Sequence, residues 1–234
     1  MFKFKEFNIN QDKTAMKVGT DGVLLGAWTS INNNPYSILD IGTGTGLIAL
    51  QLAQRSNAEL IDAIEIDDNA FEQAVNNFEQ SNWSDRLFCY HASLAEFVDE
   101  IDDKYNLIIS NPPFYSENYK SHNESRNNAR FNDSLPFNEL IESVSILLDK
   151  KGTFNVIIPF REETTFINLA EQFYLFPKRI CRVKGNPNSE IKRSLIEFSF
   201  SENKVIETNL TIEIERHNYT KEYIDLVKDF YIKM

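Results

Sequence analysis

The sequence predicts an α/β fold with a seven-stranded, mostly parallel sheet whose last strand is antiparallel. Short apolar runs alternate with helix-length amphipathic runs along most of the chain, which is typical of a doubly wound sheet. A glycine-rich turn follows the first apolar run, at 37–42. The last two apolar runs, 178–184 and 194–200, are joined only by residues 185–193. Because this connection is too short for a helical crossover, we expect these two strands to pair antiparallel.

The remaining elements follow in chain order. Five buried strands precede the final pair, and we expect them at 37–42, 59–67, 86–92, 105–110 and 153–159. Amphipathic periodicity predicts helices at 47–55, 68–81, 93–101, 134–152 and 164–174. Asp67 or Asp68 would cap the second of these helices, Ser93 begins the third, and Gly152 would end the fourth. In the segment before the first strand, Thr20 or Asp21 can cap a further helix starting at Gly22.

Size and composition favour one domain. At 234 residues and 42% hydrophobic content the chain can bury one large core, and it shows no repeat or linker. We expect a single domain over 1–234, with an N-terminal segment at 1–36 and the core at 37–234. No apolar run approaches the roughly 20 residues that span a bilayer, and the charged N-terminus does not resemble a signal peptide.

Cysteine and histidine usage argues against a metal or a disulfide framework. Cys89 and Cys181 lie far apart, and the three histidines show no metal-ligand spacing. A reducing cytoplasm is the natural location for such a chain.

The charge distribution is uneven. A net charge of −11 argues against a nucleic-acid partner for the surface as a whole, because phosphate neutralisation needs clustered Lys and Arg. Residues 178–193 nevertheless hold six basic side chains and one acidic one. This segment is either a solvated hairpin or a basic stripe that contacts RNA.

The turn after the first strand carries Gly42, Gly44 and Gly46. Glycines at this point let backbone N–H groups approach a ligand in the crevice at the strand ends. The dinucleotide fingerprint needs its third glycine five positions after the first, where this chain has Leu47. No phosphate-loop lysine follows either.

The stretch "DIGTGTG", beginning at Asp40, resembles the S-adenosylmethionine site of class I methyltransferases. In that family an acidic residue at the end of the second strand binds the ribose hydroxyls. Here the matching position is Glu65, followed by Ile66. Many members have an Asp after the third strand, near the adenine, where this chain has Ser93. The resemblance implies a class I methyltransferase fold with S-adenosylmethionine as its cofactor.

The fourth strand ends in Asn111, Pro112, Pro113 and Phe114. Two prolines stiffen the loop and remove competing N–H donors. The Asn111 side-chain oxygen and the Pro112 carbonyl can then accept the two hydrogens of an exocyclic NH₂ group, while Phe114 offers a face for stacking. The structural alternative is that Asn-Pro-Pro only terminates a strand.

This motif resembles the signature of methyltransferases that act on adenine N6, guanine N2 or glutamine amides. Residues 11–28, 127–148 and 217–231 further resemble bacterial enzymes that methylate N6 of the adenine 3′ of the anticodon in a valine tRNA. That resemblance implies a cytoplasmic monomer or weak dimer needing only S-adenosylmethionine. It also implies that the N-terminal segment covers the site, with the turn at Gly19, Thr20 and Asp21 closing over the methionine end of the cofactor.

Candidate RNA contacts lie in two places. The loop at 111–134 is long enough to be functional, and we expect it to bind substrate. Within it, Arg126 and Arg130 could meet tRNA phosphates or stack on a base. Lys192 and Arg193, which open the last strand, are further candidates.

Several alternatives stay open at this point. The same motif could serve guanine N2 in rRNA or a protein glutamine amide. Outside this chemistry, the chain could be a nicotinamide-dependent oxidoreductase or an RNA-binding protein without catalytic activity. Early placement of Gly46 argues against the oxidoreductase, and the intact Asn111–Phe114 motif argues against a silent binder.

Overall fold

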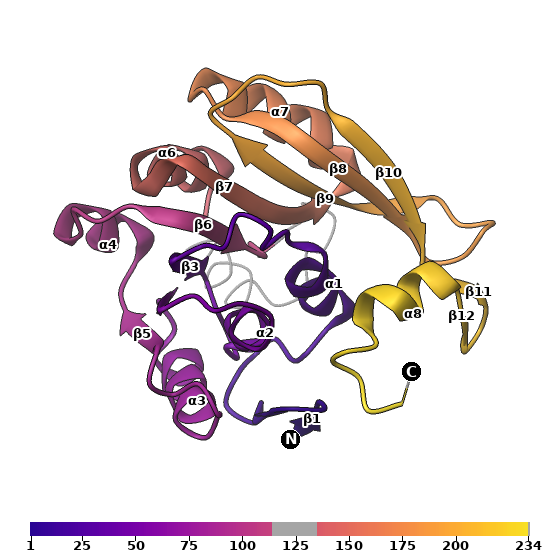
Figure 1. The fold of residues 1–234 in the computed structure, drawn as a ribbon, viewed down its shortest axis with the longest axis horizontal. Helices are drawn as coiled ribbons and strands as arrows, with labels where there is room; N and C mark the ends of the chain where they lie inside the picture. Colours follow the sequence, from indigo (N-terminus) through magenta and orange to yellow (C-terminus); the bar gives the residue numbers. More distant parts are fainter. Residues whose placement is uncertain (114–134, 234) are drawn as a thin grey trace, which may run out of the picture.

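A computed structural model describes residues 1–113 and 135–233. Its central sheet, shown in Figure 1, has the spatial strand order β10-β8-β9-β7-β6-β3-β4-β5. In chain order the strands are β3 (Ser37–Ile41), β4 (Leu60–Glu65), β5 (Leu87–His91), β6 (Tyr105–Ser110), β7 (Leu148–Pro159), β8 (Phe176–Lys184), β9 (Ile191–Ser199) and β10 (Ile206–Thr211). β9 is antiparallel to β7 and β8, and every other neighbouring pair in this sheet is parallel. The structure confirms a mostly parallel sheet with one antiparallel strand, β9, which is the last of the seven strands expected from the sequence.

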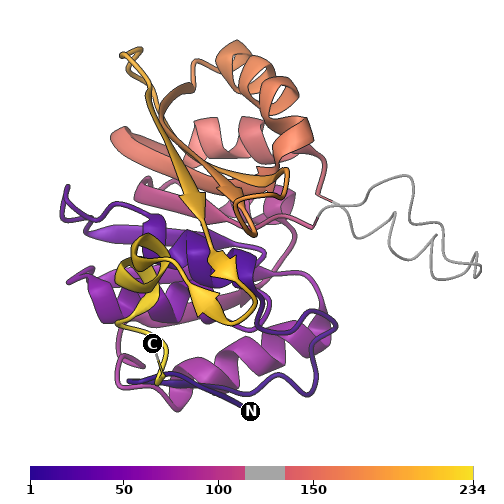
Figure 2. The ribbon, with the colours of Figure 1, turned by 90° about the vertical axis from the view of Figure 1, so that its right-hand side faces the viewer.

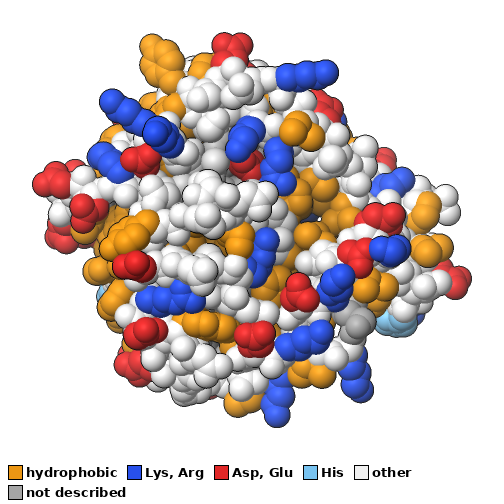
Figure 3. Space-filling model, viewed as in Figure 1, with side chains coloured by type: hydrophobic (Ala, Val, Ile, Leu, Met, Phe, Trp, Pro, Cys, Tyr) orange, Lys and Arg blue, Asp and Glu red, His pale blue; other side chains and the backbone are white. Residues whose placement is uncertain are grey.

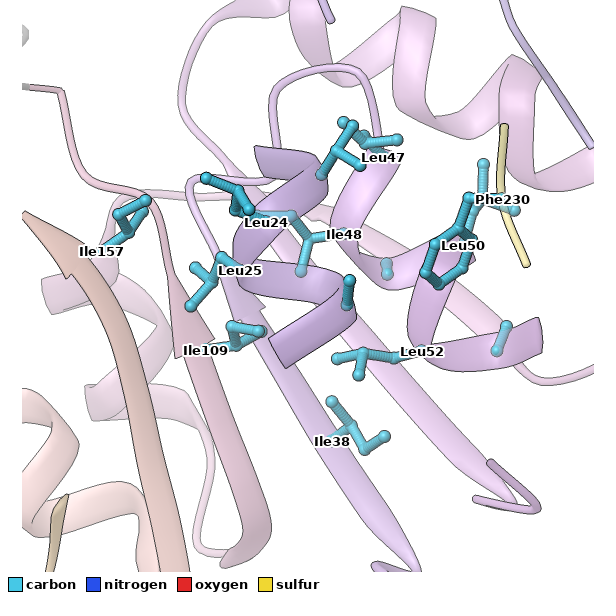
Figure 4. Packing of buried hydrophobic residues seen from close by; sticks show 14 of the residues in the cluster. Leu24, Leu25, Ile38, Leu47, Ile48, Leu50, Leu52, Ile109, Ile157 and Phe230 are labelled. Atoms are coloured by element: carbon cyan, nitrogen blue, oxygen red, sulfur yellow. The ribbon is translucent and has the colours of Figure 1, made fainter. Parts of the chain in front are cut away.

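Helices cover both faces of the sheet (Figures 1 and 2). On one face lie α1 (Thr20–Trp28), α2 (Leu47–Arg55), α3 (Asp68–Glu79) and α8 (Lys221–Val227), and on the other α4 (Leu94–Glu100), α6 (Phe137–Leu147) and α7 (Glu163–Gln172). Successive strand side chains point to opposite faces, so Leu107 joins the core under α1 and α2 while Ile108 joins the core under α6. Figure 4 shows the first core, where side chains of α1 and α2 meet Ile38, Ile109 and Ile157 from the strands.

Three sequence expectations about element boundaries were wrong. The sheet has an eighth strand, β10, which pairs with β8 at the edge of the sheet. Its first four residues are all exposed, so the strand has no alternating apolar pattern that the sequence could show. The helix expected to end at Gly152 ends at Leu147, because Leu148 pairs with Tyr105 of β6 and the chain continues as β7. Gly152 lies within β7, where a Cβ would come within 2.8 Å of the Leu148 side chain.

The third concerns α1, which starts earlier than expected. Its N-cap is Gly19, and neither Thr20 nor Asp21 caps it with a side chain. For α3, the open choice is settled in favour of Asp67, whose carboxylate accepts from the Ala70 N–H at 2.8 Å. Ser93 begins α4 as its N-cap.

The two ends of the chain close against each other. The N-terminal hairpin of β1 (Phe2–Lys3) and β2 (Asn8–Ile9) lies beside the C-terminal segment, which holds β11 (Glu213–Glu215), β12 (Asn218–Tyr219) and α8. Phe4 forms a β-bridge with Tyr231, and the Lys5 N–H donates to the Phe230 carbonyl at 2.8 Å. Both segments thus belong to the core under α1 and α2.

Among the described residues, no helix is long and apolar enough to cross a membrane. In the same part of the chain, no group of three or more His, Cys, Asp or Glu side chains could hold a metal ion.

Candidate functional site at the carboxyl edge of the sheet

Four neighbouring parallel strands end at one edge of the sheet. β6, β3, β4 and β5 lie side by side, so the residues at their carboxyl ends converge. The registers pair Ile41 with both Ser110 and Ile64, and Glu65 with His91. The glycine turn starts at this edge and leads into the N-terminus of α2. Open α/β sheets bind ligands in this kind of crevice.

Each of the three glycines in the turn adopts a left-handed backbone, with φ of +70° at Gly42, +58° at Gly44 and +78° at Gly46. A Cβ at Gly42 or Gly44 would meet nothing within 4 Å, whereas at Gly46 it would lie 2.5 Å from Cε1 of Phe78. Gly46 is therefore needed for packing against α3. Gly42 and Gly44 leave a backbone surface that a ligand can approach closely.

Glu65 is held by backbone donors at the end of β4. Its Oε2 accepts from the Gly44 N–H at 2.8 Å, and its Oε1 accepts from the N–H groups of Ile66 and Asp67 at 2.9 and 3.0 Å. These bonds fix the carboxylate beside the glycine turn, with acceptor capacity left for hydroxyl donors. The side chain of Ile66 is 58% exposed at the same edge.

Asp40 lies beneath the turn and is fully buried. One carboxylate oxygen, Oδ2, accepts from the Thr43 hydroxyl at 2.6 Å, while Oδ1 has no partner among the described residues. Burial raises the pKa of Asp40 to about 7; the Thr43 hydrogen bond opposes this rise and the nearby charge of Glu65 adds to it. Asp40 is thus a buried carboxyl group that changes charge near neutral pH.

Replacing Asp40 by Asn should change how stability depends on pH. The folded pKa of about 7 lies above the unfolded value of about 3.9, so the folded state holds a proton that the unfolded chain releases. The contribution of Asp40 to the unfolding free energy therefore falls as pH rises between these two pKa values, and it levels off above the folded pKa. From pH 5 to pH 8, the unfolding free energy of D40N should rise by about 2–3 kcal/mol relative to that of the unsubstituted protein.

Urea denaturation of both proteins at the two pH values measures this difference. Burial also raises the pKa of Asp62, but that group is present in both proteins, so its titration cancels. Parallel pH profiles for the two proteins would show that Asp40 is not the titrating group.

Asn111 follows the last residue of β6. The Ser110 hydroxyl donates to the Ile41 carbonyl at 2.9 Å, which fixes the end of β6 against β3. Asn111 is half-buried and Pro112 is buried, and Asn111 makes no side-chain hydrogen bond within 1–113 or 135–233. Asn111 thus lies at the end of β6, next to the end of β3 from which the glycine turn starts, and Pro112 and Pro113 follow it. Phe114 lies outside the described residues.

The polar groups of Ser93 are already hydrogen-bonded within the N-terminal cap of α4. Its hydroxyl donates to Glu96 Oε2 at 2.7 Å and accepts from the Glu96 N–H, while the Ser93 N–H donates to the same carboxylate. This capping box was not anticipated, although Ser-x-x-Glu is its sequence signature.

Asp21 and Arg193 form a contact that the sequence did not indicate. Arg193 Nε donates to Asp21 Oδ2 at 2.7 Å, which joins the first turn of α1 to the start of β9. The pair places Gly19 and Thr20 at the carboxyl edge of the sheet, since Arg193 is opposite Pro159 at the end of β7. A separation of 172 residues leaves no local sequence signal for such a pair.

The basic segment at 178–193 is mostly neutralised. Its ion pairs are Lys178–Glu197, Arg179–Glu197, Arg182–Glu163, Arg182–Glu207 and Arg193–Asp21. Figure 3 shows acidic and basic side chains interspersed over the face that carries α1, α2 and α8. Lys192 is exposed at the carboxyl edge and has no ion-pair partner among the residues described. Arg126 and Arg130 lie outside them.

The chain is similar to known proteins over its whole length. Residues 22–173 match the family model of the methyltransferase small domain. A Flavobacterium psychrophilum protein is 62% identical over 234 residues, covering 100% of both chains, and a Bacteroides fragilis protein is 44% identical, covering 100% of this chain and 98% of that one. Both relatives are named tRNA1(Val) (adenine(37)-N6)-methyltransferase.

Solved structures share the fold. An Agrobacterium tumefaciens structure described as a predicted O-methyltransferase has a TM-score of 0.68 at 18% identity, covering 90% of this chain and 96% of that one. A Listeria monocytogenes structure, described as a candidate class I S-adenosylmethionine-dependent methyltransferase, has a TM-score of 0.57 at 16% identity, covering 81% and 62%. At these identities the likeness establishes the fold alone.

Proposed function

Because the chain belongs to the family of tRNA1(Val) (adenine(37)-N6)-methyltransferases, we propose that it methylates N6 of adenine 37 in a valine tRNA. The observation that carries this proposal is 61–62% identity to relatives of that name over the full length of the chain. The product would be N6-methyladenosine next to the anticodon.

S-adenosylmethionine would bind at the carboxyl edge and supply the methyl group from its sulfonium. The open backbone faces of Gly42 and Gly44 fit such a ligand, as does the fixed carboxylate of Glu65, whose acceptors suit vicinal hydroxyls. The proposed cofactor site comprises Gly19, Thr20, Asp21, Asp40, Gly42, Gly44, Gly46, Glu65, Ile66, Ser93 and Asn111. The hydroxyl and N–H of Ser93 serve its helix cap, so it would contribute van der Waals contact.

Asn111 and Pro112 would position the acceptor. The Asn111 side-chain oxygen and the Pro112 carbonyl each accept one hydrogen of the adenine amino group, which directs the nitrogen lone pair toward the methyl. The nucleophile is a neutral amine, so neither a general base nor a metal would be needed to start the transfer. The nitrogen–methyl bond would form as the sulfur–methyl bond breaks, S-adenosylhomocysteine would leave, and the methylated nitrogen would release its extra proton to water. Positioning of this kind can supply roughly 7–11 kcal/mol. Pro113 stiffens the loop, and Phe114 is the proposed stacking partner of the target base.

The tRNA footprint would be small. We propose that residues 1–36, the loop at 111–134 and the start of β9 supply it within a single domain, with Arg126, Arg130, Lys192 and Arg193 meeting the RNA. The target adenine must leave its stack, at a cost of a few kcal/mol. Because this footprint is small and would contact the RNA through Lys and Arg side chains, we expect weak and strongly salt-dependent binding by a cytoplasmic monomer or weak dimer.

The test uses labelled S-adenosylmethionine and total tRNA from a strain that lacks the gene. After incubation with the purified protein, nuclease digestion and mass spectrometry identify the methylated nucleoside and its fragment. We expect N6-methyladenosine confined to a valine tRNA fragment. In parallel incubations with ribosomal RNA and with cell protein, transfer only to guanine N2 of the RNA or to a glutamine amide would overturn the substrate but keep the amine chemistry. Cofactor binding without any transfer would contradict the proposal altogether.

A further inference from the structure

One exposed aromatic side chain lies at the same edge as the proposed acceptor site. Phe160 begins the 3-10 turn η1 (Phe160–Glu162) directly after β7 and is 38% exposed. β7 is the neighbour of β6, the strand that ends before Asn111. Single exposed apolar residues are common on protein surfaces. The surroundings of Phe160 give this one a specific interpretation.

The turn that carries Phe160 is held rigidly from below. Glu163, which starts α7, is buried, and its carboxylate accepts from Arg182 Nη2 at 2.7 Å, from Arg182 Nε and from the Ser194 hydroxyl. A second carboxylate, Glu207, accepts from Arg182 Nη1 at 2.8 Å. The guanidinium of Arg182 lies 6.0 Å from the centroid of the Phe160 ring. An aromatic ring on an anchored turn is preorganised to receive a flat group.

Strand register places Phe160 near Asn111, but too far from it for both residues to contact the same base. Ser110 pairs with Val156, so Asn111 lies level with Ile157 and Phe160 lies three residues further out. That step amounts to roughly 10 Å along the strand direction, and the neighbouring strand is about 5 Å away. A group on Phe160 therefore lies beside the amine bound by Asn111, at a distance that an adjacent nucleotide can cover.

Basic side chains lie near this position, two of them ion-paired. Arg161, the next residue, has a side chain 55% exposed and is paired with Glu162. On the adjacent strand, Arg193 lies opposite Pro159 and is paired with Asp21, and the exposed Lys192 precedes it. An exposed aromatic flanked by basic side chains is the arrangement that binds unpaired bases, with stacking on the ring and phosphates at the cations.

We propose that Phe160 stacks on an unpaired RNA base next to the target adenine, and so contributes to the selection and binding of the RNA substrate. This inference rests on the proposed tRNA methyltransferase function. The target base itself goes to Asn111, and Phe160 holds its neighbour out of the loop stack.

The test compares three single variants in steady-state methylation of a synthetic anticodon stem-loop of valine tRNA. F160L keeps an apolar side chain but loses the flat ring, F160W keeps a ring, and F88L removes a matched Phe, 43% exposed, on the edge strand β5. We expect F160L to raise KM for the RNA about ten-fold, within the range for loss of one base–aromatic stack. Its kcat and its affinity for S-adenosylmethionine should not change. F160W should restore KM, and F88L should leave it unaltered.

The failures are distinguishable. An F160L variant with unchanged KM, or one whose raised KM is matched by F88L or not restored by F160W, overturns the stacking role while the methyltransferase function stands. Weaker cofactor binding by F160L would assign the ring to the cofactor instead and would also overturn it. If the unsubstituted protein transfers no methyl group to the stem-loop or to tRNA, the proposed function itself fails.

Discussion

Asn111→Ala should abolish most methyl transfer while leaving the cofactor bound. Removing the side-chain oxygen leaves one amine hydrogen without its acceptor, so the nitrogen is no longer aimed at the methyl. We expect kcat to fall about a hundred- to a thousand-fold, as it does when one preorganised hydrogen-bonding group is removed from other enzymes. Single-turnover methylation of valine tRNA measures the rate, and calorimetry measures binding of S-adenosylmethionine.

Asn106→Ala is the matched control. Asn106 lies on the same strand, and its Oδ1 accepts from the N–H groups of Tyr36 and Ser37 at 3.0 and 3.2 Å at the opposite end of the sheet. That variant should lose about 1–2 kcal/mol of stability and keep its kcat. A normal rate in Asn111→Ala would refute the positioning mechanism, whatever happens to stability.

Glu65→Ala should weaken binding of the cofactor, S-adenosylmethionine. Two charge-assisted hydrogen bonds to the ribose hydroxyls would be lost, and the Gly44 N–H would lose its acceptor. Since hydrogen bonds to a charged group contribute about 1.5–3 kcal/mol each, the Kd for S-adenosylmethionine should rise about a hundred-fold or more. Calorimetry with the cofactor and with S-adenosylhomocysteine measures the change.

Asp68→Ala provides the comparison. Its carboxylate is three residues away, is 86% exposed and contacts His91, but it accepts no hydrogen bond from the glycine turn. We expect that variant to bind the cofactor normally. Equal effects of the two substitutions would point to a general change in charge, and tight binding by Glu65→Ala would remove Glu65 from the ribose site.

The parts of the fold that local pattern controls were predictable. α2 was expected at 47–55 and is found at Leu47–Arg55. It was predictable because its apolar face and the glycine turn before it both depend on residues that are close together in the sequence. The strands that end at Glu65 and Ser110 were likewise located, since buried parallel strands are continuous apolar runs. The glycines, Glu65 and Asn111 therefore fell at one edge of the sheet as expected.

Features decided by tertiary pairing were not predictable. Residues Leu148–Lys151 continue a helical pattern, yet they belong to β7, where Leu148 pairs with Tyr105 of β6 and the regular pairing resumes at Thr153. β10 has no apolar alternation, as its pairing with β8 uses the backbone. The Asp21–Arg193 pair joins residues from opposite ends of the sequence. In each case the deciding partner is distant in the chain.

The closure of the two chain ends has a consequence for synthesis on the ribosome. The ring of Phe4 stacks on Phe7 and packs near Tyr231, which lies 227 residues later in the sequence. The hairpin at residues 2–9 is thus completed only after residues 230 and 231 have been synthesised. Until then the nascent chain carries exposed phenylalanines in this hairpin, a state prone to association with other chains. Removal of Phe230 and Tyr231 would leave the hairpin of every molecule in that state.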